Sequence, residues 1–76
     1  MKNVKVMLAT IDDVKNFVGS VMKAEYDVDL NSGRYSIDAK SIMGIFSLDL
    51  SKPIELVAHT DDATTLFADI KQFIVE

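Results

Sequence analysis

The hydrophobic residues of this chain change their spacing along the sequence, and this change limits the folds that the chain can form. Val4, Val6 and Leu8 alternate with other residues, whereas Val14 and Phe17 begin a spacing of three or four residues. Strict alternation indicates a strand with one buried face, and the wider spacing indicates an amphipathic helix. The pattern predicts strands near residues 3–8, 26–30, 35–38 and 53–59, and helices over 11–24, 41–47 and 61–75.

The predicted order of elements, β-α-β-β-α-β-α, favours the α+β class. Strands with one polar face and helices with one apolar stripe are expected to form an antiparallel sheet with helices on one side. The chain has 76 residues, of which 49% are hydrophobic, so a modest core can form without metal or disulfide. We therefore predict a single domain over residues 1–76.

Short polar segments mark the expected ends of these elements. Thr10, with Asp13 three residues later, resembles a capping box at the start of the first long helix. Asn31-Ser32-Gly33 is expected to form a hairpin loop, and Pro53 suits the first position of a strand. Thr60-Asp61-Asp62 is expected to open the last helix.

Composition excludes several classes of function. The chain has no cysteine, and its eight Lys and Arg residues are scattered in a sequence of net charge −4, which argues against a nucleic-acid partner. No apolar run approaches the roughly 20 residues that a membrane span needs. Residues 1–5 lack the apolar core of a signal peptide, so a cytoplasmic location is expected. The paired Asp residues open helices, and no catalytic, metal or cofactor site is predicted.

Ser41 and the residues after it form the segment that carries most functional information. A Ser before an apolar run is commonly a helix cap, and the same hydroxyl is also a candidate acceptor for a phosphoryl group. Met43 and Phe46 are three residues apart and share a helix face. Ile42 and Ile45 are enough to anchor so short a helix, so Met43 and Phe46 are either core residues or an exposed apolar patch that marks a partner site.

Lys40-Ser41-Ile42-Met43-Gly44, followed by Phe46-Ser47-Leu48, resembles the regulatory serine segment of HPr. HPr is the histidine-containing phosphocarrier of the bacterial sugar phosphotransferase system, and the resemblance is densest from Tyr26 to Ala58. It implies an open-faced two-layer sandwich with strand order 1-4-2-3. It also implies that Ser41 is a regulatory phosphorylation site, beside a surface where partners dock: Lys40, Ile42, Met43, Phe46 and Ser47.

The second signature of that family is missing. Its Gly-Ile/Leu-His-x-Arg-Pro loop after the first strand has no match, because residues 8–15 read Leu-Ala-Thr-Ile-Asp-Asp-Val-Lys. Asp12 and Asp13 would repel a phosphoryl group at the start of the helix. His59, the single histidine, is either a solvated residue at a strand end or an atypical acceptor.

The sequence thus leaves three hypotheses for function. The first is a non-enzymatic, HPr-like regulatory domain that acts by protein-protein contact and is switched at Ser41; the catabolite-repression variant of the family, which lacks the His and keeps the Ser, is a precedent. The second is a phosphocarrier in sugar uptake with an atypical acceptor, and the third is a degenerate paralogue without a phosphotransferase role. The resemblance implies partners among phosphotransferase-system proteins, the HPr serine kinase or a transcriptional regulator.

Overall fold

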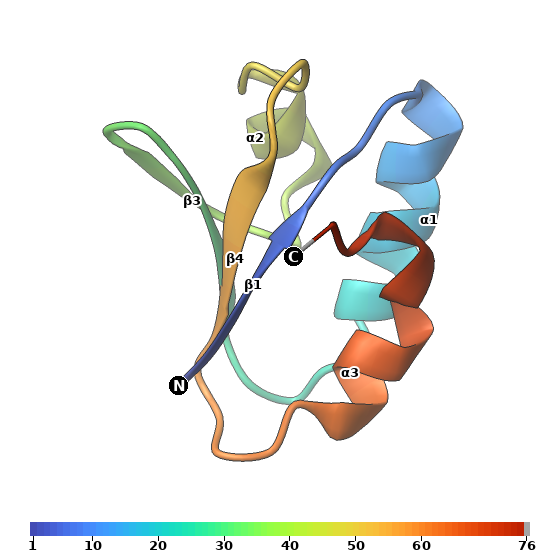
Figure 1. Ribbon diagram of the computed structural model, residues 1–76, viewed down its shortest axis with the longest axis vertical. Coiled ribbons are helices and arrows are strands. Elements are labelled where there is room, and N and C mark those ends of the chain that lie inside the picture. Colours follow the sequence, from blue (N-terminus) through green and yellow to red (C-terminus); the bar gives the residue numbers. More distant parts are fainter. Residues whose placement is uncertain (76) are drawn as a thin grey trace.

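Four antiparallel strands form one sheet, and the helices lie over one of its faces (Figure 1). The computed structural model describes residues 1–75. The strand order is β1-β4-β2-β3, which confirms the predicted α+β class and the order implied by the resemblance. In chain order the elements are β1 (Lys2–Val6), α1 (Ile11–Val21), β2 (Val28–Ser32), β3 (Tyr35–Asp38), α2 (Ile42–Phe46), β4 (Ile54–Ala58), α3 (Thr64–Asp69) and a short 3₁₀ helix, η1 (Lys71–Phe73).

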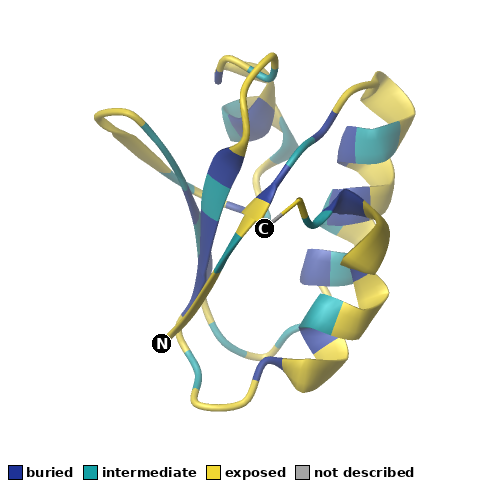
Figure 2. Cartoon of the chain, viewed as in Figure 1, coloured by how far each residue is buried: buried dark blue, intermediate teal, exposed yellow. Residues whose placement is uncertain are grey.

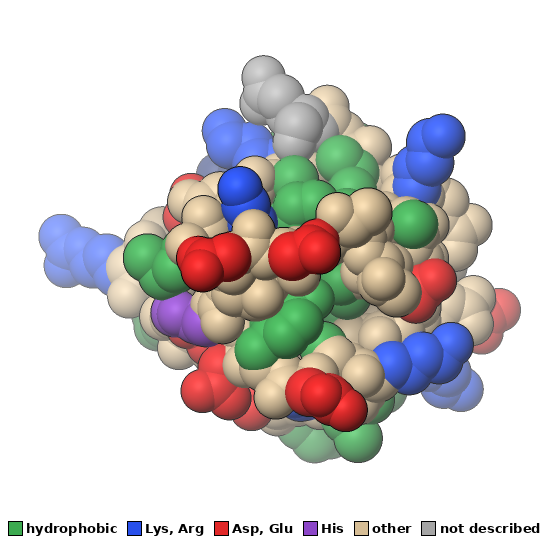
Figure 3. Space-filling view, turned by 90° about the horizontal axis from the view of Figure 1, so that it is seen from below, with side chains coloured by type: hydrophobic (Ala, Val, Ile, Leu, Met, Phe, Trp, Pro, Cys, Tyr) green, Lys and Arg blue, Asp and Glu red, His purple; other side chains and the backbone are tan. Residues whose placement is uncertain are grey.

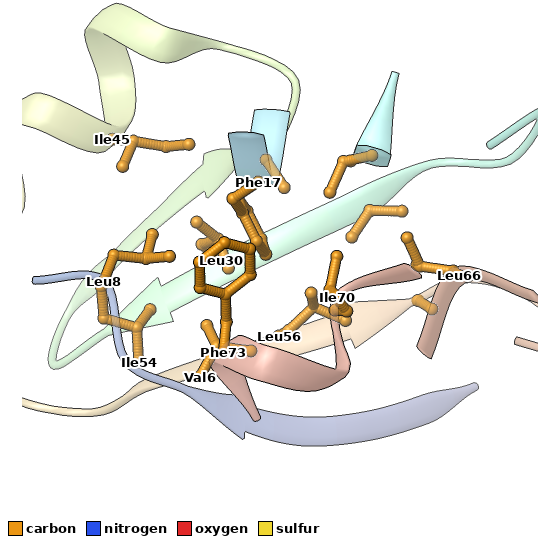
Figure 4. Packing of buried hydrophobic residues seen from close by; sticks show 14 of the residues in the cluster. Val6, Leu8, Phe17, Leu30, Ile45, Ile54, Leu56, Leu66, Ile70 and Phe73 are labelled. Carbon is orange, nitrogen blue, oxygen red and sulfur yellow. The ribbon is translucent and has the colours of Figure 1, made fainter. Parts of the chain in front are cut away.

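The core lies between the sheet and the two longer helices (Figure 2). Leu56, in the central strand β4, pairs with Val4 of β1 on one side and with Leu30 of β2 on the other. Phe17 of α1 and Phe73 of η1 meet edge to face above the sheet, with ring centroids 6.0 Å apart and planes at 80° (Figure 4). Burial of these apolar side chains holds the two layers together.

The last helix is shorter than the predicted 61–75. It begins at Thr64, because the side chains before it form local turns instead. Thr60 Oγ1 accepts a hydrogen bond from the Asp62 amide at 3.2 Å, and Asp62 Oδ1 accepts one from the Thr64 amide at 3.0 Å. Such side-chain bonds to the backbone compete with helix formation. Asp62 therefore precedes the helix as an acceptor for its first amide, and the helix ends at Asp69.

The chain after η1 runs along the outer edge of β1. The Val75 amide donates to the Lys5 carbonyl, and the Met7 amide donates to the Phe73 carbonyl, each at 2.9 Å. The hydrophobic spacing of the C-terminal residues predicts a helix up to residue 75. Residues 74 and 75 are extended instead, because their backbone groups pair with β1. β1 ends at Val6, two residues before the predicted limit of 3–8, because its pairing with β4 ends at Ile54, the first residue of β4.

The hairpin between β2 and β3 also differs from the prediction. β2 covers 28–32 rather than 26–30, and Asn31 and Ser32 are strand residues. The turn is Gly33-Arg34, directly after the Ser32–Tyr35 pair. Gly33 has φ +60°, and a positive φ at the first of two turn residues is typical of a type II′ hairpin. A turn at this place was predicted correctly. Because Ser32 pairs with Tyr35, the turn consists of Gly33 and Arg34 rather than of residues 31–33.

Helix α1 ends at Val21, three residues before the predicted limit of 24. The Lys23 amide donates to the Ser20 carbonyl at 3.2 Å, and the Ala24 amide donates to the Val21 carbonyl at 3.0 Å. These bonds span three residues, so they tighten and close the last turn of the helix.

The other face of the sheet carries no helix within residues 1–75 (Figure 1). Glu55 lies at its centre and accepts hydrogen bonds from Asn3 Nδ2 at 3.3 Å and from Asn31 Nδ2 at 3.2 Å. Polar side chains from three strands are thereby linked on the open face. None of the helices described is long and apolar enough to span a membrane.

Candidate functional site

Ser41 is placed at the start of α2 by a short, well-bonded turn after β3. Ala39 is buried, and the Ser41 amide donates to the Asp38 carbonyl at 3.0 Å. Asp38 Oδ1 accepts the Lys40 amide at 2.9 Å, which fixes the same turn from the side-chain end. Ser41 Oγ accepts a hydrogen bond from the Gly44 amide at 3.2 Å, which confirms the predicted cap. The residue is exposed, so its hydroxyl can be reached from solvent.

Gly44 leaves room for the Ser41 side chain. A Cβ atom at Gly44 would lie 3.2 Å from Ser41 Oγ and 3.3 Å from Ile37 Cδ1. Both distances are tighter than ordinary contacts between carbon side chains and their neighbours. The glycine thus permits α2 to pack on β3 while the hydroxyl of Ser41 stays in its capping position.

The short helix α2 divides its apolar side chains between the core and solvent. Ile45 is fully buried and Ile42 packs partly against the core, whereas Met43 is 77% exposed and Phe46 is 42% exposed. The exposed patch is therefore present and the core alternative for Met43 and Phe46 is wrong. Ile11, another exposed apolar residue, opens α1 at the same end of the molecule (Figure 1).

Two of the predicted partner-binding residues use their polar atoms within the fold. Lys40 Nζ donates to the Ala24 carbonyl at 3.0 Å, just beyond the end of α1, where a cation is favoured by the helix dipole. Ser47 Oγ donates to the Gly44 carbonyl at 2.5 Å and closes the end of α2. The ammonium of Lys40 is thus engaged with the loop after α1, although its backbone adjoins Ser41.

The start of α1 already supplies its own hydrogen-bond partners. Thr10 Oγ1 accepts the Asp13 amide at 3.0 Å, and Asp13 Oδ2 accepts the Ala9 amide at 3.1 Å. The predicted cap is confirmed, except that Asp13 bonds one residue further back than in a capping box. Because a carboxylate occupies this terminus, with Asp12 beside it, the site is unfavourable for a second anion.

His59 follows β4 at the opposite end of the molecule from the start of α1 (Figure 1). Its Nε2 lies 2.7 Å from Asp29 Oδ2, and both side chains are about two-fifths exposed, at 40% and 38%. The His59 amide also donates to the Asp27 carbonyl at 2.9 Å. Sequence reasoning missed Asp29 as a partner, since the two residues lie 30 positions apart and meet only because β2 neighbours β4.

Two exposed carboxylates have pKa values lowered by local hydrogen bonds. The hydroxyl and amide of Ser51 lower the pKa of Asp49 in the loop after α2. Hydrogen bonds from Thr64 likewise lower the pKa of Asp62 before α3. Both lowered pKa values therefore result from hydrogen bonds that stabilise local turns, and neither indicates a catalytic group. Across residues 1–75 no group of three or more His, Asp or Glu side chains could hold a metal ion.

The fold and the exposed helix α2 define a class: small open-faced sandwiches of the phosphocarrier type. The chain belongs to the HPr family of the sugar phosphotransferase system, because the family model described as "PTS HPr component phosphorylation site" matches residues 14–76. Proteins of this family are phosphocarriers that interact with other proteins of that system. The match begins at Val14, after the segment 8–13 that lacks the family's His and Arg.

Comparison with solved structures supports the same assignment. HPr-C-His from Thermoanaerobacter tengcongensis is 25% identical, with a TM-score of 0.79 over 95% of this chain and 89% of that one. The catabolite repression containing protein Crh of Bacillus subtilis, described as an intertwined, swapped dimer, is 23% identical, with a TM-score of 0.65 over 93% and 88% of the two chains. Both share the fold. None of the curated proteins compared with the sequence matches it.

Proposed function

We propose that residues 1–76 act as a non-catalytic regulatory domain of the HPr type in the bacterial cytoplasm. In this proposal the domain works by docking α2 against a protein partner, and phosphorylation of Ser41 changes which partner is bound. The observation that carries the proposal is an exposed hydroxyl at the start of α2, the short helix that also bears the exposed apolar side chains of Met43 and Phe46.

A phosphate on Ser41 would act mainly on recognition. The modification adds about −1.5 to −2 charges beside the exposed apolar pair. Lys40, the nearest cation in the sequence, directs its ammonium to the Ala24 carbonyl, and the Asp38 carboxylate already lies in the same turn. An Arg or Lys of the partner would then neutralise the phosphate. A partner with a bare apolar groove would be lost, and one with an Arg or Lys beside its groove would be gained.

A second function, phosphoryl transfer through His59, rests on the contact with Asp29. The Asp29 carboxylate engages Nε2 of the ring, and the His59 side chain is partly exposed. Asp27, Asp61 and Asp62 lie in the adjoining segments, and they would oppose an incoming phosphoryl group. We therefore expect no acid-labile phosphohistidine after incubation with the general phosphotransferase enzyme and phosphoenolpyruvate.

The decisive experiment uses the HPr serine kinase and ATP. The kinase would transfer the γ-phosphoryl group to Ser41 Oγ: the new oxygen-phosphorus bond replaces the bond to ADP, and the hydroxyl proton passes to a base. Mass spectrometry should find one added phosphate on the peptide that contains Ser41. Ser41→Ala should abolish it, and Ser47→Ala, the matched control at the other end of α2, should not.

A comparison of the partners bound by each form of the protein distinguishes a regulatory domain from a degenerate paralogue. Phosphorylated protein and Ser41→Asp should share one partner profile, and unmodified protein and Ser41→Ala should share another. Met43→Ser with Phe46→Ser, both on exposed positions, should lose both profiles and keep the fold. Absence of phosphate at Ser41 under conditions that modify authentic HPr would leave this residue a helix cap and the chain without a Ser41 switch.

A further inference from the structure

A groove separate from the α2 surface lies between the end of α1 and α3. Its volume is about 320 Å³. Its apolar wall is formed by Ala24, Tyr26 and Leu66, all of which pack on the core. The remaining lining residues are polar or charged: Ser20, Lys23, Glu25, Thr65 and Asp69. None of the residues of α2 contributes to it.

Negative charge is concentrated around this groove. Segments 25–27 and 61–69 together contain five of the twelve acidic residues and neither Lys nor Arg. Glu25 and Asp69 line the groove directly. Figure 3 looks at this end of the molecule and shows acidic side chains around a hydrophobic patch. Three cations lie near these acids: Lys23 is on the lining, the Lys40 ammonium donates to the carbonyl of Ala24 in the groove wall, and Lys2 contributes to the environment of Asp62.

The lining favours a side chain of another protein over a small molecule. Small-molecule sites combine an apolar cavity with a few buried polar groups that orient the ligand. Here the described residues include no buried polar or charged side chain, and the groove is at the lower end of the usual size range. A partner segment with one apolar side chain between cationic residues would match this lining. The apolar side chain would contact the apolar wall, and the cations would face Glu25 and Asp69.

We propose that this groove docks a basic amphipathic segment of a protein partner, with one bulky apolar side chain against Ala24, Tyr26 and Leu66 and Lys or Arg residues facing Glu25 and Asp69. The surface differs from the α2 surface in position and in chemistry. A partner can therefore occupy the groove while α2 remains free, which gives the domain two docking faces. The inference stands independently of any phosphorylation of Ser41.

The probe for this groove is a labelled twelve-residue peptide with Leu and Phe anchors among Lys and Arg. Fluorescence anisotropy should show binding that weakens with added salt, and amide NMR shifts should map to residues 23–26 and 65–69. Glu25→Lys with Asp69→Lys should weaken binding about tenfold, as expected for losing two exposed ion pairs. Asp49→Lys, an exposed acid in the loop after α2, is the matched control and should weaken it much less.

Shape is tested separately from charge. Thr65→Trp should fill the groove and abolish binding without removing an acid, whereas Ala68→Trp, exposed on the same helix and outside the lining, should bind like the parent protein. A basic peptide in which Ser replaces both anchors should bind at least tenfold more weakly. Equal binding of that peptide, shifts that map to α2 or the open sheet, or insensitivity to Thr65→Trp would each overturn the proposal.

Discussion

Alanine in place of Gly19 should stabilise the fold, whereas the same substitution at Gly44 should not. Gly19 is exposed in α1, and a Cβ atom there would meet nothing within 4 Å. Because Ala is favoured over Gly in a helix interior, Gly19→Ala should raise the free energy of unfolding by about 0.5–1 kcal/mol. In a domain of this size that corresponds to about 2–8 °C in melting temperature.

At Gly44 the same gain is offset by two close contacts. The new Cβ would lie 3.2 Å from Ser41 Oγ and 3.3 Å from Ile37 Cδ1, so the capping hydroxyl or α2 itself must shift. Loss of a Ser cap typically costs about 1 kcal/mol, which cancels the gain in helix propensity. We expect Gly44→Ala to be neutral or to destabilise the domain by up to about 1 kcal/mol.

Thermal and urea unfolding of the two variants, alone and with Ser41→Ala, measure the difference. In the Ser41→Ala background the contact with Oγ is gone, so Gly44→Ala should become more favourable, while Gly19→Ala should keep its effect. Equal stabilisation by the two glycine substitutions in the parent protein would refute the reasoning, because it would mean that the space around Ser41 does not depend on Gly44.

Three further substitutions test the packing and the electrostatics of the fold. Phe73→Ala removes one ring of the buried aromatic pair and should lower the free energy of unfolding, measured with urea, by about 3–5 kcal/mol. Lys40→Met removes the donor to the carbonyl beyond α1 and should cost about 1 kcal/mol without preventing phosphorylation of Ser41. The pKa of Asp62 is lowered in the folded state, so its contribution to the free energy of unfolding is complete above the unfolded-state pKa of about 4 and is lost as the pH falls through the folded-state pKa. Asp62→Asn should therefore weaken the loss of stability between neutral and acid pH. An unchanged pH dependence would contradict the role of the hydrogen bonds from Thr64.

Local signals in the sequence predicted the elements that are stabilised locally. Ser41 and Thr10 were recognised as caps because each precedes an apolar run with the right spacing, and both make the expected bond. For Met43 and Phe46 the sequence left open whether they belong to the core or to an exposed patch, and only the structure shows that both are exposed. The layers followed from hydrophobic periodicity, whereas the strand order came from the resemblance to HPr.

Features that depend on distant partners could not be predicted in this way. The C-terminal residues have helical spacing, yet Val75 pairs with the carbonyl of Lys5, 70 positions earlier. His59 meets Asp29 only through the neighbouring positions of β2 and β4. The groove beside Tyr26 joins the end of α1 with α3, two segments whose proximity no local pattern reveals.

The pairing of the C-terminal residues with β1 has a consequence for synthesis of the protein. β1 is synthesised before the other three strands of its sheet, but its partner β4 begins at Ile54, and its outer edge is covered only when Val75 arrives. Long-range pairing of this kind delays folding until most of the chain is present. In a nascent chain stalled after α2, β1 would lack its partner strand, and the side chains of Val4 and Val6 would have no β4 to pack beside.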